Sequence, residues 1–547
     1  MKKILIIILS ISLVSCNKNL DKLPLNAPSS ESFPTNKDEL QTALVGCNNP
    51  LLQTFGENPF AQVFEMFSDN AANRDLTPDK MWGDPSGGYV APIWNNLYVG
   101  ISRCNFLLDN LDKARKNVDE SVILNVGAQA RYLRAYYYSL LTGFFGGVPY
   151  VTRTLNLEEA NVAKTSRENI VDSILNELSA IAPHLNQTNQ PASMEISRGA
   201  AWALQSRVAL FNGKWQTAID AAKKVIALEN VEFSLNPNYG DICKLAGNNS
   251  KELIFSVHWN YNDITNIAPV SFKSRNAKGF NNRMPTQSLV DSYECIDGLP
   301  IDKSPLYNPQ KPFQNRDPRL QLTIAVPGSV FCGYEYETHK DSLTCWNYNV
   351  TPAVRIANQD AINPFASFSG FAWRKYVDPA ELDQANKSAI STVLIRYAEV
   401  LLNYAEAMIE SNQIDNSVYD AINKVRERAQ MPKITTGKTQ KELRSIVRKE
   451  RKVELAGEGL RYFDVIRWKI GEKVLNGPCY GRIPRGFLAS APAIDENGTP
   501  DYTGVSNYKD MRVIQVRIFD PSKNYLWPIP FIELQTNKNL VQNPNYN

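Results

Sequence analysis

A helical hairpin around residue 213 constrains the fold more than any other feature of this sequence. Residues 198–210 carry apolar side chains at three- and four-residue spacings, which predicts a helix. Gly213-Lys214-Trp215 ends that helix, and the spacing then returns at Ala218, Ile219, Ala222, Val225 and Ile226. A helix, a short turn with an aromatic residue, and a second helix with alanines at close-packing positions are typical of a tetratricopeptide-like repeat.

The same spacing recurs both before and long after this hairpin. It predicts helices at 93–111, 128–141 and 166–181, and again at 393–409, 418–429 and 441–455. Repeat units cannot bury their apolar faces alone, so the early and late helices are expected to stack into one body. The predicted fold class is therefore mainly α, with tetratricopeptide-like repeats forming one scaffold.

The segment between the two sets of helices has a different character. Residues 231–392 are rich in Asn, Gly, Pro and aromatic residues and show little helical period, which predicts loops and short strands. The expected organisation is an N-terminal helical region at 38–230, a loop-rich excursion at 231–392 and a C-terminal helical region at 393–547. Because functional residues concentrate on loops held by a rigid scaffold, the excursion is expected to carry a ligand surface.

The N-terminus predicts export and a lipid anchor. Residues 1–15 have a basic start, a short apolar run and a small residue before Cys16, which is typical of a signal peptide and too short for a membrane span. Leu13-Val14-Ser15-Cys16 matches a lipobox, so Cys16 is expected to be acylated and residues 16–37 to form a tether. Several acyl chains, at about 0.8 kcal/mol per buried CH₂, give lasting attachment. An ordinary secretory cleavage beside a coincidental cysteine is the alternative.

Charge and motifs exclude several classes of function. Without Lys2 and Lys3 the chain carries 57 basic and 56 acidic residues, so nothing favours nucleic acid as a partner. His184, His258 and His339 show no metal-ligand spacing, and the sequence has no P-loop, GxGxxG or GxSxG motif. We therefore expect no metal and no cofactor. A glycoside hydrolase stays open, because it needs only two carboxylates whose separation the sequence does not reveal.

Seven cysteines remain once Cys16 is assigned to lipid, and an odd number leaves at least one free thiol. Cys332 and Cys345 flank a short loop and are the pair expected to form a disulfide.

Motifs spread over nearly the whole mature chain resemble the SusD/RagB family of Bacteroidota. They are the lipobox and the segments at 129–136, 145–149, 197–200, 213–215, 285–293, 297–298, 315–319, 394–402, 450–455, 459–468, 526–530 and 542–546. The resemblance implies an α-helical lipoprotein of the outer membrane that faces the cell exterior. It also implies that the protein lies as a lid over a SusC-like TonB-dependent transporter. Proteins of this family bind a glycan, or in some members a peptide, and are not enzymes.

Most of these motifs have a structural interpretation. The charged residues on the predicted late helices lie at spacings where opposite charges meet, so structural ion pairs are expected rather than catalysis. They are Arg396, Glu399, Glu450, Arg451, Glu454, Arg461, Asp464 and Arg467.

Candidate ligand residues follow from the chemistry of a sugar, which offers flat C–H faces and a rim of hydroxyls. Binding it calls for exposed rings flanked by short polar groups, an Arg or an Asp. A polar loop where family members place part of the ligand site supplies Asp69, Asn73, Arg74, Trp82 and Tyr89. The excursion supplies Trp259, Tyr261, Arg283, Trp346 and Tyr348, from segments that alternate rings with polar groups.

The same alternation is also typical of a half-buried strand with its rings inward. The Asn and aromatic content favours a neutral glycan, with a peptide as the main rival. Two further hypotheses for the function are an exported glycoside hydrolase and an adaptor that binds only proteins.

Overall fold

The computed structural model describes residues 33–55, 58–59, 61–75, 77, 80, 83–191, 193–384 and 386–546. The predicted signal peptide, Cys16, most of the tether and Trp82 lie outside the described residues. None of the helices in the described part of the chain is long and apolar enough to cross a membrane.

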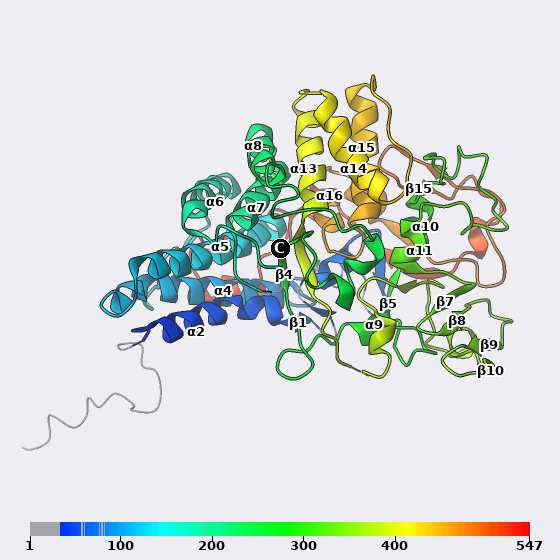
Figure 1. The fold of residues 1–547 in the computed structure, drawn as a ribbon, viewed down its shortest axis with the longest axis horizontal. Coiled ribbons are helices and arrows are strands. Elements are labelled where there is room, and N and C mark those ends of the chain that lie inside the picture. Colours follow the sequence, from blue (N-terminus) through cyan, green and yellow to red (C-terminus); the bar gives the residue numbers. More distant parts are fainter. Residues whose placement is uncertain are drawn as a thin grey trace, which may run out of the picture.

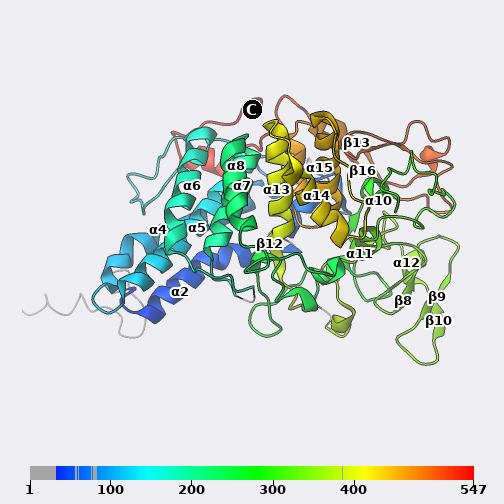
Figure 2. The ribbon, with the colours of Figure 1, turned by 45° about the horizontal axis from the view of Figure 1, so that its top comes forward.

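One half of the molecule is a stack of helices, each packed on the next (Figures 1 and 2). The early members are α2 (Lys37–Asn48), α4 (Val90–Asn110), α5 (Glu120–Phe145), α6 (Arg167–Ile181), α7 (Arg198–Phe211) and α8 (Trp215–Ile226). Helix α8 packs against α13 (Tyr397–Glu410), which in turn contacts α14 (Asn416–Arg428) and α15 (Gln440–Glu454). The early and late helices therefore form one scaffold, and the predicted mainly α fold is confirmed.

The hairpin at residue 213 folds for the reasons that the sequence suggests. The Ser197 side chain caps α7 by accepting a hydrogen bond from the Ala200 backbone N–H. Gly213 adopts a φ of 70°, a left-handed conformation that favours glycine, and so lets the chain reverse into α8. Ala218, Ile219, Ala222 and Val225 of α8 are buried, and the helix packs against α7 and α13.

One predicted helix is wrong at its start. Residues 392–396 form a strand, β12 (Thr392–Arg396), paired antiparallel with β4 (Leu253–Val257), and α13 begins only at Tyr397. Thr392, Val393 and Ile395 are β-branched and suit a strand, and every residue of β12 and β4 is buried. Tertiary pairing with a strand far away in the sequence overrides the helical spacing here.

The other half of the molecule holds the excursion, where short helices and strands alternate with loops. Its helices are α9 (Pro269–Phe272), α10 (Gln287–Ser292), α11 (Arg319–Thr323) and α12 (Gln359–Ile362). Two-stranded pairs join β3 (Ala71–Asn73) to β5 (Arg283–Pro285) and β6 (Ile324–Ala325) to β11 (Ala372–Trp373). A projecting sheet has the order β10-β9-β8-β7, visible at the lower right of Figure 1, with β7 (Ser329–Phe331), β8 (Tyr334–Tyr336), β9 (Thr344–Asn347) and β10 (Val354–Ala357).

The expected disulfide between Cys332 and Cys345 is wrong, because all the described cysteines are free thiols. Cys332 lies in the turn between β7 and β8, and its carbonyl accepts a hydrogen bond from the Asn349 side chain at 3.1 Å. Cys345 lies on β9, and its sulfur accepts a hydrogen bond from the Asn276 side chain at 3.2 Å. The two cysteines therefore have different partners.

The C-terminal part of the chain packs back against the helical scaffold. It contains α16 (Arg461–Arg467), α17 (Gly471–Val474) and α18 (Phe531–Thr536), with β13 (Gly477–Tyr480) paired to β16 (Val513–Arg517) and β14 (Ala493–Ile494) paired to β15 (Pro500–Asp501). A short pair, β1 (Thr54–Phe55) and β2 (Asn58–Pro59), lies near the start of the chain. Trp527 is fully buried between Phe67 and Phe144, which ties the last residues to the early helices.

The predicted structural ion pairs are confirmed, and they join the two halves of the molecule. Arg396 contacts Glu252, Glu454 and Glu458 at 2.6 to 2.7 Å, with every side chain at most 3% exposed. Arg319 of the excursion reaches Glu450 and Glu454 of α15. We call these residues the buried ion network.

Candidate functional site

The polar loop at 68–75 folds largely inward instead of forming an exposed surface. Asp69 is 4% exposed and lies between Arg461 at 2.7 Å and Lys452 at 3.0 Å. Burial alone would raise the pKa of Asp69, but the two cations hold it well below its usual range. Asp69 therefore forms buried ion pairs in the core. The prediction that it lies on the ligand surface is wrong.

Asn73 and Arg283 are also buried, and they brace the loop from opposite strands. The two residues face each other across the β3–β5 pair, and Arg283 Nη1 donates to Asn73 Oδ1 at 2.9 Å and to Asp75 Oδ2 at 3.2 Å. The sequence named both residues as ligand candidates, on two separate segments, and did not predict that they pair. Both residues lie beneath the surface, where they support the loop, and not on the surface itself.

Above this support lies an exposed cluster, which we call the arginine–phenylalanine patch: Arg74, Asp75, Arg275, Phe280 and Phe365. Arg74 lies over the Phe365 ring at 5.5 Å, and Arg275 lies over the Phe280 ring at 5.9 Å. Phe365 is 61% exposed and Phe280 is 40% exposed. Both guanidinium groups donate to the Phe365 carbonyl, Arg74 from Nη1 at 3.3 Å and Arg275 from Nε at 3.0 Å. Two cations and two open rings are thus held at fixed positions.

A buried carboxylate fixes the base of the patch. Asp360 Oδ1 accepts a hydrogen bond from the Arg275 backbone N–H at 2.6 Å, and Asp360 is only 1% exposed. Burial raises the pKa of Asp360 to about 6.

Sequence reasoning did not select Arg275, Phe280 or Phe365 as ligand residues. Phe280 belongs to one of the alternating segments, but Phe365 follows a proline and has no alternating neighbours. Nothing in the sequence near Arg275 signals that its backbone is held by a carboxylate 85 residues away.

Two of the four central aromatics, Trp259 and Tyr261, turn inward, although neither lies on a strand. Trp259 is 6% exposed, and its indole N–H donates to Thr392 Oγ1 at 3.0 Å. Tyr261 donates its hydroxyl to Glu381 at 2.8 Å, and Tyr89 is half-buried beside Phe67 at a ring distance of 6.0 Å. The interior position of Trp259 corrects its expected role as an exposed platform.

Trp346 and Tyr348 are exposed, at 38% and 48%, but they lie apart from the patch. Cys345, the neighbour of Trp346 on β9, faces Asn276, whose side-chain N–H donates to the Cys345 sulfur at 3.2 Å. Since successive side chains on a strand point to opposite faces, Trp346 points away from the segment that carries Arg275. Trp346 instead contacts Arg355, which lies over its ring at 5.2 Å.

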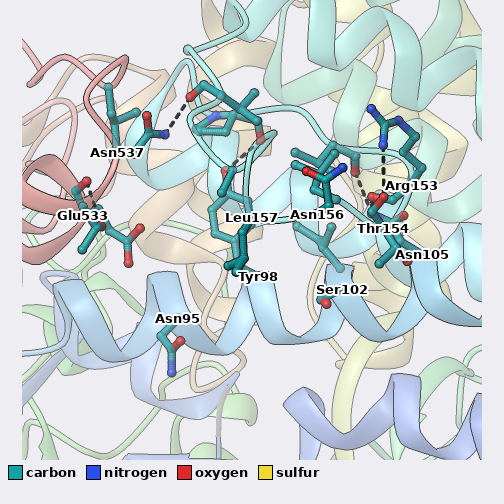
Figure 3. A pocket seen from close by; sticks show the side chains of 18 of the residues that line it. Asn95, Tyr98, Ser102, Asn105, Arg153, Thr154, Asn156, Leu157, Glu533 and Asn537 are labelled. Atoms are coloured by element: carbon teal, nitrogen blue, oxygen red, sulfur yellow. Dashed lines mark hydrogen bonds between the residues drawn. The ribbon is translucent and has the colours of Figure 1, made fainter. Parts of the chain in front are cut away.

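A groove with a volume of about 1070 Å³ lies elsewhere, between α4, residues 149–162 and α18 (Figure 3). Its polar side chains mainly hold its own walls together: Tyr98 donates to the Pro149 carbonyl at 2.8 Å and Asn537 to the Val162 carbonyl at 2.8 Å. None of the predicted ligand residues that the structure describes lines this groove.

Comparison with known proteins gives consistent matches over the whole chain. The SusD family profile matches residues 249–546, and a second profile, described as starch-binding associating with outer membrane, matches residues 20–210. SusD-like protein P2 of Formosa agariphila is 26% identical over 574 residues, covering 100% of this chain and 99% of that protein. A SusD-like protein of Bacteroides ovatus is 23% identical over 435 residues, covering 75% of this chain and 71% of that protein.

Solved structures agree with this match. The crystal structure of a SusD-like carbohydrate binding protein from Bacteroides fragilis superposes with a TM-score of 0.79 at 29% identity, covering 92% of this chain and 99% of that one. A laminarin binding SusD-like protein has a TM-score of 0.62 at 20% identity, covering 94% of this chain and 100% of that one, and supports the fold alone.

Proposed function

Because the chain belongs to the SusD family, whose members include carbohydrate-binding proteins, we propose that it captures a glycan at the outer membrane without cleaving it. We further propose that it passes the glycan to a SusC-like TonB-dependent transporter, and that a lipid on Cys16 anchors it facing the cell exterior. The description of the second matching profile, which associates starch binding with the outer membrane, supports this location.

The observation that carries the proposal is the arginine–phenylalanine patch. Phe365 and Phe280 each have one face against an arginine and are 61% and 40% exposed, so the C–H face of a sugar can stack on the other face. Arg74, Arg275 and Asp75 surround these rings with donors and acceptors for hydroxyl groups. Because buried Asp360, Asn73 and Arg283 fix the positions of these groups, little side-chain entropy remains to be lost when a sugar binds.

The charges of the patch support binding without hydrolysis. A glycoside hydrolase needs one carboxyl group that is protonated to act as an acid and a second carboxylate on the other side of the bond. Burial would raise the pKa of Asp75, but Arg74 and Arg283 lower it, so Asp75 stays ionised. Asp360 has a raised pKa but lies under the patch, bonded to the Arg275 backbone, and cannot reach a bound sugar.

The proposal is tested by affinity gel retardation of soluble protein lacking residues 1–16, on starch, laminarin and other neutral glycans, with reducing-sugar release assayed on the same samples. We expect retardation by one glycan class without release of sugar. Phe280→Ala and Phe365→Ala together should abolish retardation, whereas Phe531→Ala should not. Phe531 is a matched control because it is 51% exposed on α18.

Other outcomes would redirect the interpretation. Release of sugar would favour the glycoside hydrolase, and silence on every glycan would turn the search to peptides. Loss of binding in Phe531→Ala would place the ligand outside the patch.

The partner and the anchor need separate tests. A TonB-dependent barrel should co-purify with the tagged protein from outer membranes. Cys16→Ser should release the protein from the membrane fraction, and retention of that variant would rule out the lipid as the anchor.

A further inference from the structure

A second groove lies at the end of the helical stack, away from the elements that build the patch. It is bordered by the start of α6, the turn between α7 and α8, the end of α16 and residues 521–526, and its volume is about 870 Å³. We call it the basic groove, because its lining residues include five cations and two carboxylates. These charged residues are Arg167, Arg448, Arg467, Lys469, Lys523, Glu406 and Glu410.

Both carboxylates are already occupied by other partners. Glu406 accepts two hydrogen bonds from Arg467, at 2.6 and 2.7 Å, and one from the Trp468 indole at 2.8 Å. Glu410 pairs with both nitrogens of the Arg444 fork at 2.8 Å. Arg448 approaches Glu410 only at 3.6 Å. The groove therefore keeps an excess of positive charge.

Three cations of the groove have no carboxylate within ion-pair distance among the described residues: Arg167, Lys469 and Lys523. Arg167 Nε donates to Asn212 Oδ1 at 2.8 Å, and Lys469 lies over the Tyr525 ring at 4.1 Å. Arg167 and Lys469 line the same groove. Burial lowers the pKa of both groups, and the charge of Arg167 lowers the pKa of Lys469 further, while Glu472 raises it only in part. Partly buried like charges are unfavourable, so an anion between these two cations would be stabilised.

The walls of the groove favour an organic anion over a free ion. Phe211, Trp215 and Leu526 give it an apolar side, and its volume lies in the range of about 300 to 1,000 Å³ that is usual for small-ligand sites. The Trp468 ring is already covered by Arg448 at 4.7 Å and Arg467 at 4.9 Å. Trp215 is half-buried and remains as a flat surface for stacking.

From these contacts we infer that the basic groove is a second ligand site, which takes an acidic saccharide unit with its carboxylate or sulfate between Arg167 and Lys469. A guanidinium fork suits either anion. The inference rests on the proposed function, since it takes the ligand to be a sugar, but it involves none of the residues of the patch.

The test is isothermal titration of the soluble protein with trigalacturonate, with a sulfated carrageenan disaccharide, with neutral maltotriose and with sodium sulfate, all at low salt. We expect one of the two acidic saccharides to bind, and which one binds distinguishes a uronate from a sulfate ester. Arg167→Gln combined with Lys469→Gln should weaken that binding at least tenfold, and Arg167→Lys should weaken it less. Lys441→Gln, an exposed lysine on α15, should leave it unchanged.

The failure of this inference differs from the failure of the proposed function. Phe280→Ala with Phe365→Ala should leave acidic-saccharide binding within twofold. If acidic binding follows those rings instead of Arg167 and Lys469, the patch is the only site supported and the second site is wrong. Equal binding of sodium sulfate and of the saccharides would identify an adventitious ion only. The inference would also be overturned if the wild-type protein showed an intact thermal unfolding transition but bound neither acidic saccharide.

Discussion

The buried ion network and the arginine–phenylalanine patch both contain arginines, but the arginines have different partners and different burial. In the network, Arg396 is saturated by three carboxylates, and burial together with those carboxylates leaves it no contact with water. In the patch, Arg275 donates to a backbone carbonyl and lies over an exposed ring, with no carboxylate in ion-pair distance among the described residues. The network connects the two halves of the fold, whereas the patch keeps unused donors at the surface. An arginine thus indicates structure or binding only once its partners and burial are known.

The largest test of this comparison removes the centre of the network. Arg396→Ala would leave Glu252, Glu454 and Glu458 buried without their shared cation, so we expect the free energy of unfolding to fall by about 3–5 kcal/mol. Urea denaturation followed by tryptophan fluorescence measures it. Arg115→Ala removes an exposed arginine that pairs with Asp112 and should unfold at nearly the wild-type urea concentration. Equal midpoints for the two variants would break the comparison.

A second test concerns the carboxylate that links the patch to the fold. Burial raises the pKa of Asp360 to about 6, above its unfolded value of about 3.9, so the native state holds its proton more tightly. The contribution of Asp360 to stability is therefore fully present below pH 4 and is lost as the pH rises through 6. Asp360→Asn should remove that loss, so its unfolding free energy relative to wild type should rise by about 1–3 kcal/mol between pH 4 and 7. A constant difference across that range would contradict the raised pKa.

The sequence predicted the scaffold well because local spacing determines it. Apolar residues at helical intervals located α4, α6, α7, α8, α14 and α15 to within a few residues, and charge spacing correctly marked Arg451, Asp464 and Arg467 as ion-paired residues. It failed at 393–396, where pairing with β4 decides the conformation. Non-local pairing leaves no signal in a local window.

The candidate site was predicted only in outline. Arg74 and Arg283 were named as candidates on two separate segments, and the pairing of β3 with β5 brings those segments together. Burial inverted the roles of Asp69 and Trp259, because a polar or aromatic residue in an irregular segment carries no mark of which way it faces. Phe365 became part of the site through contacts with Arg74, 291 residues earlier in the chain.

A third test replaces one arginine of the patch and, as a control, an arginine outside the patch that makes the same kinds of contact. Arg275→Gln should lower the affinity for the captured glycan about three- to tenfold, on the order of 1 kcal/mol, because a charged donor beside the Phe280 ring is lost. Arg374→Gln is the control, since Arg374 also donates to a backbone carbonyl, that of Val330, and lies over a ring, that of Phe331. Titration calorimetry on both variants sharpens the comparison. Similar losses would mean that the contact type, and not its place in the patch, sets the affinity.

The smallest expected effect concerns Trp346, which is more exposed than Trp259, the other described tryptophan that the sequence proposed for stacking. Trp346→Ala should change glycan affinity less than twofold, because β9 points Cys345 toward Asn276 and therefore turns Trp346 away from Arg275. Its ring lies against Arg355, as the rings of the patch lie against Arg74 and Arg275, so the expectation rests on the direction of β9 and not on the arginine contact. Affinity measured on both short and long oligosaccharides decides the matter. A tenfold loss confined to long chains would show that the ligand continues across the edge of the projecting sheet, so that both of its faces belong to one extended surface.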